Sequence, residues 1–124
     1  MSGGEDRKLL GRWGEQLVAE KLRKSGCVIE GAGWRCRMGE IDLIVSDGTY
    51  LRFVEVKLRK DASFAQAREF VDARKRQRLR TAAQLYLAQH PTHLQPRFDV
   101  AEVYAPQGLA TKAPAIQYIE DAFR

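Results

Sequence analysis

Two short runs rich in β-branched and other apolar residues lie close together near the middle of the chain, at residues 39–44 and 53–57. An Asp-Gly pair at residues 47–48 lies between them. Strand-forming runs joined around Asp-Gly are typical of a β-hairpin. Large apolar residues fall on both faces of this hairpin, which indicates strands covered on both sides rather than strands with one face in water.

The Asp-Gly pair also sets the register of the hairpin. A turn centred on it places Glu40 opposite Glu55, and it makes Asp42 and Glu55 diagonal neighbours roughly 7–8 Å apart at the backbone. Because side chains alternate between the two faces of a strand, these three acids share a face with Lys57. The opposite face then carries Ile41, Leu43, Val45, Val54 and Val56.

The shared face of Asp42, Glu55 and Lys57 predicts a metal site. Ionised groups inside apolar strands are costly unless an opposite charge compensates them. Two carboxylates that reach toward each other can share a divalent cation, and Mg²⁺ takes oxygen ligands at about 2.0–2.1 Å. We therefore expect Mg²⁺ or Mn²⁺ on Asp42 and Glu55, with Lys57 beside them to hold a water or a phosphate oxygen. The alternative is a set of charges on the solvated face of an amphipathic hairpin.

The first predicted helix covers residues 6–24 and ends at a Ser-Gly pair. Gly11 and Gly14 lie inside it, although an interior glycine costs about 1 kcal/mol relative to alanine. Close approach of the helix to the sheet would explain both glycines, and it would bring Glu15 onto the hairpin as a further acid. The alternative leaves Glu15 at the edge of the packing face with its carboxylate in water.

The second predicted helix follows Asp72 as its N-cap and ends near Gln89. Lys75 lies on its apolar stripe, one turn before Leu79. The arginines that flank this lysine are Arg74, Arg76, Arg78 and Arg80. Cations at a helix N-terminus, where the helix dipole also favours anions, predict a phosphate-binding surface. The alternative is a solvated basic helix whose side-chain stems cover the edge of the core.

Other segments complete the expected scaffold. A first strand is expected at residues 27–30 and a last strand at residues 116–122. Residues 97–104 form a strand reached through the second helix, so a right-handed crossover lays it parallel to residues 53–57. A loop beside the site is expected at residues 59–70.

These motifs resemble those of one family of small bacterial proteins, the YraN-like branch of the PD-(D/E)XK nuclease superfamily. The resemblance rests on Gly-Arg-x-Gly-Glu in the first helix, on residues 39–44 and 53–59, on Lys75 and on the Arg-Phe-Asp-Val of residues 97–100. It implies a restriction-endonuclease-like α/β fold, an αβββαβ core whose mixed central sheet is flanked by helices. It also implies a single nuclease domain over residues 1–124. The same fold is found in archaeal Holliday-junction resolvases.

By that resemblance Asp42 and Glu55 are metal ligands, Lys57 is the catalytic lysine, and Glu15 is an additional acid contributed by a helix. The Pro-Asp of the superfamily name is Ile41-Asp42 here, a departure that is common in the superfamily. Basic residues near this set would hold the nucleic-acid backbone. The residues expected to do so are Arg59, Arg74, Lys75 and Arg78.

The charge balance points to a polyanionic partner. The chain has 21 basic and 16 acidic residues and a formal charge of +5, which favours nucleic acid. We expect DNA, structured or branched by analogy with the resolvases, although the sequence leaves RNA and a homodimer open. No apolar run approaches the roughly 18 residues of a membrane span, and no signal-peptide apolar region precedes Asp6. A cytoplasmic protein without a membrane partner is therefore expected.

Three functions are compatible with these features. The first is a Mg²⁺- or Mn²⁺-dependent nuclease that hydrolyses phosphodiester bonds. The second is a non-catalytic nucleic-acid-binding module that retains the nuclease fold, and the third is a protein-interaction subunit that uses its charged face for a partner. A binding module gains nothing from an acidic cluster, so Asp42, Glu55 and Lys57 together favour the nuclease.

Overall fold

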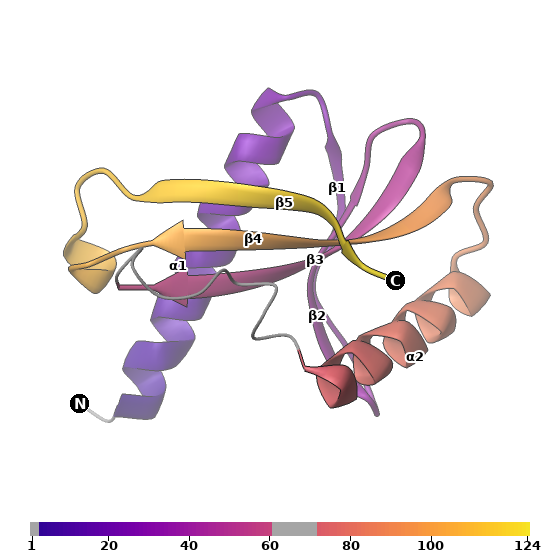
Figure 1. The fold of residues 1–124 in the computed structure, drawn as a ribbon, viewed down its shortest axis with the longest axis horizontal. Helices are drawn as coiled ribbons and strands as arrows, with labels where there is room; N and C mark the ends of the chain where they lie inside the picture. The colour runs from indigo at the N-terminus through magenta and orange to yellow at the C-terminus, as the bar shows by residue number, and fades with distance from the viewer. Residues whose placement is uncertain (1–2, 61–71) are drawn as a thin grey trace.

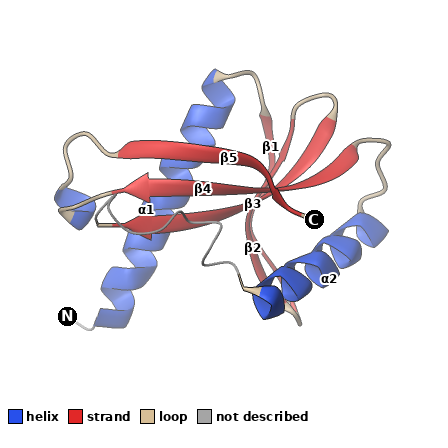
Figure 2. Ribbon diagram, viewed as in Figure 1, coloured by secondary structure: helices blue, strands red, loops and turns tan. Residues whose placement is uncertain are grey.

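The computed structural model describes residues 3–60 and 72–124, in which a helix is followed by three strands, a second helix and two further strands (Figure 1 and Figure 2). The helices are α1 (Gly3–Lys24) and α2 (Ala73–Gln89), with a short 3₁₀ helix, η2 (Gly108–Ala110). The strands are β1 (Val28–Cys36), β2 (Gly39–Ser46), β3 (Tyr50–Arg59), β4 (Gln95–Tyr104) and β5 (Ala115–Phe123). Most of the predicted loop at residues 59–70 lies outside the described residues.

A mixed sheet of five strands, in the order β1-β2-β3-β4-β5, forms the centre of the described part. Neighbouring strands are antiparallel except β3 and β4, which run parallel. That parallel pair is connected through α2, as the crossover argument predicts. The sheet and its two helices match a restriction-endonuclease-like core, so the expected α/β fold is confirmed.

Each face of the sheet packs against one helix. On one face Val18 and Leu22 of α1 pack with Leu43 of β2 and Val54 of β3. On the other face the core consists of Ile41, Ile44, Leu51, Phe53, Leu79, Ala82, Ala83, Tyr86 and Val100. The strands are thus covered on both sides, which accounts for the apolar residues on both faces of the central hairpin.

Both helices have boundaries close to the predicted ones. α1 begins at Gly3, ahead of the predicted residue 6, and is closed by Gly26, whose φ is 96°. α2 follows its predicted N-cap, Asp72, whose carboxylate accepts the Lys75 N–H at 2.8 Å. Among the described residues, neither helix is long and apolar enough to cross a membrane.

The first strand is longer than predicted. β1 continues to Cys36, beyond the predicted end of the strand at residue 30, and passes through a glycine-rich stretch. Its pairing with β2 shifts between Ile29 and Gly31, and Gly33 has a φ of 63°. A register shift of this kind lets glycines remain within a strand at a local bend. A composition that predicts a loop therefore forms part of the sheet.

The turn of the β2–β3 hairpin is centred one residue later than predicted. The Asp47 N–H donates to the Tyr50 carbonyl at 3.2 Å, which makes Gly48 and Thr49 the central pair. The Asp47 carboxylate accepts the N–H groups of Thr49 at 2.9 Å and Tyr50 at 2.7 Å. An aspartate that bonds its own backbone in this way occupies the first position of a turn, not a central one.

This turn corrects the predicted register. Leu43 pairs with Val54, and not with Arg52 as the predicted turn would require. The predicted register was wrong by two positions along the strand. Because an even shift moves no side chain to the other face, the residues of the paired part of the hairpin stay on their predicted faces.

The side chains of β2 stop alternating between the two faces of the sheet at Asp42. Ile41 packs with Ile44 in the core under α2, whereas Leu43 lies in the core under α1. The prediction that Ile41 and Leu43 share a face was therefore wrong. Ile41 and Leu43 pair with the β1 residues on either side of Gly33, which has a left-handed backbone conformation.

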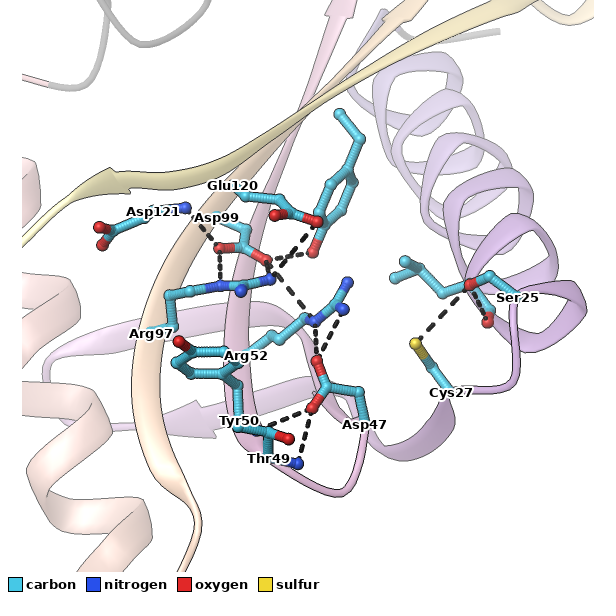
Figure 3. A network of polar contacts seen from close by, with 12 residues as sticks. Ser25, Cys27, Asp47, Thr49, Tyr50, Arg52, Arg97, Asp99, Glu120 and Asp121 are labelled. Carbon is cyan, nitrogen blue, oxygen red and sulfur yellow. Dashed lines mark hydrogen bonds and ion pairs between the residues drawn. The ribbon is translucent and has the colours of Figure 1, made fainter.

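A buried carboxylate on β4 anchors β5. Asp99 is fully buried and accepts hydrogen bonds from Arg97 Nε at 2.9 Å, Tyr118 Oη at 2.5 Å and the Asp121 N–H at 2.9 Å. Figure 3 shows these groups converging on the carboxylate from both strands. The charge of Asp99 is thus compensated within the fold, so this network holds the last strand in place and is structural.

The Asp47 turn predicts a measurable pH dependence. Burial raises the pKa of Asp47, but the N–H groups of Tyr50 and Thr49 and the Arg52 guanidinium outweigh it and lower the pKa to about 2. A lowered pKa contributes stability that is present above the unfolded value near 3.9 and is lost as pH falls toward 2. We expect Asp47→Asn to cost about 1 kcal/mol at pH 6 and little at pH 2.

The measurement is denaturant unfolding of wild type and variant at several pH values. Glu20→Gln, which removes an exposed acid of α1, is the matched control and should show no such trend. An equal cost of Asp47→Asn at pH 6 and pH 2 would show that the turn does not depend on the charge.

Candidate active site

The candidate site lies where β2 and β3 separate. The hydrogen-bonded pairs of these strands end at Leu43 and Val54, and beyond them Asp42 Oδ2 accepts the Val56 N–H at 2.8 Å. A carboxylate therefore takes the bond that a strand partner would take in a continuous ladder. Glu55, on β3, is buried beside it, with 5% of the residue exposed.

α1 brings Glu15 to the same place. A Cβ atom on the neighbouring Gly14 would lie 3.2 Å from the Leu58 side chain, so glycine allows the helix to approach β3 closely. The same explanation for Gly11 was wrong, because a Cβ there would meet nothing within 4 Å. The structure thus places Glu15 over the hairpin, half-buried, as the close-approach interpretation predicted.

Three carboxylates meet at this point. Glu15, Glu40 and Asp42 each have an oxygen atom within 4.8 Å of the others. Hard divalent cations prefer carboxylate oxygens, so these residues fit Mg²⁺ or Mn²⁺ by donor type and by proximity. Glu40 was predicted to share a face with Asp42 but was not predicted to be a metal ligand. Its spacing of two residues from Asp42 was the sequence signal that could have indicated this role.

The electrostatics of this cluster favour a bound cation. Burial and the charge of Glu55 together raise the pKa of Asp42 to about 7, although the hydrogen bond from the Val56 N–H acts in the opposite direction. Burial also raises the pKa of Glu15 to about 6, with added repulsion from Glu40 and Glu55. Acids that are buried together repel one another when ionised, and a divalent ion would relieve that repulsion.

Two lysines contact Glu55. Lys75 Nζ, from α2, lies 2.7 Å from Glu55 Oε1, and Lys57 Nζ, from β3, lies 3.6 Å from the same oxygen. Burial lowers the pKa of Lys57; Glu55 opposes this effect and Lys75 adds to it. Burial also opposes the charged form of Lys75, but the hydrogen bond and charge of Glu55 outweigh it and raise the pKa of Lys75.

The arginines expected to bind nucleic acid lie in two different environments. Arg74 and Arg78 are exposed on α2, where a ligand can reach them. Arg59 is half-buried on β3, with its Nε 3.9 Å from Oε2 of the fully buried Glu102 of β4. The side chain of Arg59 therefore lies toward the interior of the sheet, whereas Arg74 and Arg78 form a basic surface on α2 that is exposed to solvent.

A groove of about 890 Å³ runs between α1 and the β1–β2 hairpin and reaches Glu15 and Glu40. Its basic lining residues are Arg7, Lys8, Arg12, Arg23 and Arg35. Sequence reasoning missed this set, because the residues are spread over a helix and a hairpin. The helical spacing of Lys8, Arg12 and Glu15 on one side of α1 was the signal that could have found part of it.

Comparison with known proteins assigns the chain to a family. The family model described as "Uncharacterised protein family UPF0102" matches residues 14–103, most of the chain. The chain belongs to the UPF0102 family. The YraN-like resemblance inferred from the sequence motifs is thereby confirmed. The region that matches UPF0102 contains Glu15, Asp42, Glu55 and Lys75. It therefore includes both the carboxylate cluster and the ion pair of Glu55 with Lys75.

Several UPF0102 relatives cover most of the chain. A UPF0102 protein of Pseudomonas aeruginosa strain LESB58 is 38% identical over 125 residues, 99% of this chain and 98% of the relative. One from Pelotomaculum thermopropionicum is 42% identical over 119 residues, 94% and 97%. One from Herpetosiphon aurantiacus is 47% identical over 83 residues, 67% of each chain. These names state the family only, so the activity has to be inferred from the site.

Proposed function

We propose that this UPF0102 protein is a metal-dependent nuclease that hydrolyses phosphodiester bonds of nucleic acid. The observation that carries the proposal is the meeting of Glu15, Glu40 and Asp42 within 4.8 Å, with two lysines on the adjoining Glu55. A hard-cation site next to paired ammonium groups is suited to a phosphodiester, whose charge both can hold.

Asp42 is the central residue of the proposed metal site, with Glu15 and Glu40 beside it. Glu55 is the other proposed ligand, and both lysines contact its Oε1. When bound, Mg²⁺ or Mn²⁺ would polarise the phosphate and lower the pKa of a water. The carboxylates would hold the metal cation next to the phosphate, which the carboxylates alone would repel.

The chain's own cations supply the remaining chemistry. Lys57 would orient the attacking water or stabilise charge that develops on the phosphate oxygens. β3 positions its backbone, and its ammonium lies 3.6 Å from Glu55 Oε1, as an ion pair. Arg74 and Arg78 on α2, together with the basic residues of the α1 groove, would hold the rest of the backbone. Structured or branched DNA is the proposed substrate, by analogy with the resolvases that share the fold.

The test is a cleavage assay on a panel of single-stranded, duplex, forked and four-way DNA and RNA, with Mn²⁺ or with a chelator. Metal-dependent cleavage by wild type, absent from Asp42→Asn prepared in the same way, supports the proposal. Binding of nucleic acid without cleavage of any substrate would support the non-catalytic binding module instead.

The basic surface of α2 gives a separate prediction. Each neutralised phosphate releases counterions, with a slope of about −0.9 in log affinity against log salt on duplex DNA. Replacing Arg74 and Arg78 with alanine should reduce the magnitude of that slope by up to about two and weaken binding similarly across sequences. Fluorescence anisotropy at several salt concentrations measures it.

The matched control is Lys24→Ala with Lys112→Ala, which removes the same charge from two exposed positions outside α2. The control should leave the slope nearly unchanged. A slope that falls equally in both double variants would mean that net charge alone, and not the α2 surface, determines binding.

A further inference from the structure

The four acids of the site lie in two different environments. Glu15, Glu40 and Asp42 form the group whose oxygens lie together, and Glu55 is not a member of that group. Glu55 is instead held by Lys75 at 2.7 Å, within hydrogen-bonding distance. Within the part of the chain that the structure describes, the ion pair of this cluster is the longer one between Arg35 and Glu40, at 3.9 Å. The acids of the site are therefore divided between this cluster and Glu55, which has a lysine within hydrogen-bonding distance.

The position of Lys75 is fixed by α2. Its backbone N–H is bonded to the N-cap Asp72 at 2.8 Å, and one turn later Leu79 is buried in the core. The helix N-terminus therefore cannot shift without losing a cap and a core contact. Unlike the exposed Arg74 on the same turn, Lys75 is half-buried and directed at the site.

We propose that Lys75 takes the place of a second metal ion, so that this site works with a single divalent cation. The inference rests on the proposed nuclease function and specifies its metal stoichiometry. Two-metal phosphodiesterases place their ions about 3.5–4 Å apart, where the pair stabilises both the attacking and the leaving oxygen. Here the ammonium of Lys75 occupies the cation position at Glu55 Oε1, and it contacts the substrate phosphate from the side opposite the acid cluster.

The proposal gives Lys75 a role different from that of a general backbone contact. If the ammonium replaces an ion, its removal exposes Glu55 Oε1, and the ion pair that remains among the described residues is the longer one with Lys57, at 3.6 Å. A buried carboxylate that has lost its nearer partner is a site for a divalent cation. The variant should therefore gain a metal ion, which the loss of a phosphate contact would not cause.

Calorimetric titration of the full chain with Mn²⁺ tests this without substrate. Wild type should bind one ion, and Lys75→Met should bind two. Lys75→Arg keeps a cation at Glu55 and should bind one. Lys112→Met removes a charge from an exposed position and should also bind one. Melting temperatures establish that each variant is folded; if Lys75→Met is not, Lys75→Gln replaces it and should likewise bind two ions.

The outcomes separate the inference from the function on which it rests. Two ions on wild type, or one ion on a folded Lys75→Met or Lys75→Gln variant, would overturn the role of Lys75 and leave the nuclease proposal standing. No Mn²⁺ on wild type would contradict the nuclease proposal, and the inference with it. Cleavage provides a second readout: Lys75→Met should lose activity at low Mn²⁺ and regain it as Mn²⁺ rises.

Discussion

Asp42→Asn should abolish Mn²⁺ binding and reduce cleavage by roughly 10³-fold or more, because a bound metal supplies several kcal/mol of transition-state stabilisation. The asparagine keeps an oxygen that can accept the Val56 N–H now bonded to Asp42 at 2.8 Å. It also removes an acid whose charge is disfavoured by burial and by Glu55. We therefore expect the variant to be at least as stable as wild type.

Calorimetry, single-turnover cleavage and thermal melting on the same preparation measure the three effects. Glu120→Gln, which removes an exposed acid from β5, is the control and should bind metal and cleave normally. A folded Asp42→Asn variant that still binds Mn²⁺ with wild-type affinity would exclude Asp42 as the central ligand. Retained binding with lost cleavage would mean that the acid acts in the reaction and not in holding the ion.

Local sequence signals predicted the separate helices and strands, and the family resemblance implied how these elements combine into the fold. The N-cap at Asp72, the helix-ending Gly26 and the apolar strands covered on both faces each follow from residue type and spacing. The parallel pairing of β3 and β4 then follows from the crossover rule. None of these steps needs a contact between residues distant in sequence.

The predicted register of the β2–β3 hairpin was wrong because the Asp-Gly dipeptide alone does not determine its position in the turn. Asp-Gly can occupy the centre of a turn or its first two positions, and here the Asp47 carboxylate selects the second by binding the Thr49 and Tyr50 N–H groups. The pairing of Leu43 with Val54, in place of Arg52, depends on that choice. A turn motif alone therefore predicts that a hairpin forms, but not which residues face each other.

The candidate site could be predicted only in part. Periodicity placed Lys75 on the apolar stripe of α2, which left its head group without an assigned partner. The structure supplies Glu55, a residue of a different element, at 2.7 Å. A rule of strict alternation between the two faces of a strand also could not predict the break at Asp42, next to the left-handed Gly33 of β1. Contacts between elements, not within them, determine these features.

Lys57→Ala should leave metal and nucleic-acid binding nearly intact while cleavage falls by roughly 10²–10³-fold, the scale of losing one transition-state stabiliser. Lys57→Arg should not restore full activity, because a planar guanidinium differs in shape and hydrogen bonding from a compact ammonium. A structural role for Lys57 gives a different expectation: removal would cost stability, and any loss of cleavage would follow the loss of folded protein.

The geometry at Glu55 makes these two expectations separable. Lys75 is the nearer partner of Glu55, at 2.7 Å against 3.6 Å for Lys57, so Lys57→Ala leaves the buried carboxylate with its shorter ion pair. The melting temperature should therefore change little, in contrast to Lys75→Met, which removes the closer cation. Single-turnover rate and melting temperature measured on both variants decide between the roles. A folded Lys57→Ala variant that binds substrate and cleaves at the wild-type rate would exclude Lys57 from the reaction.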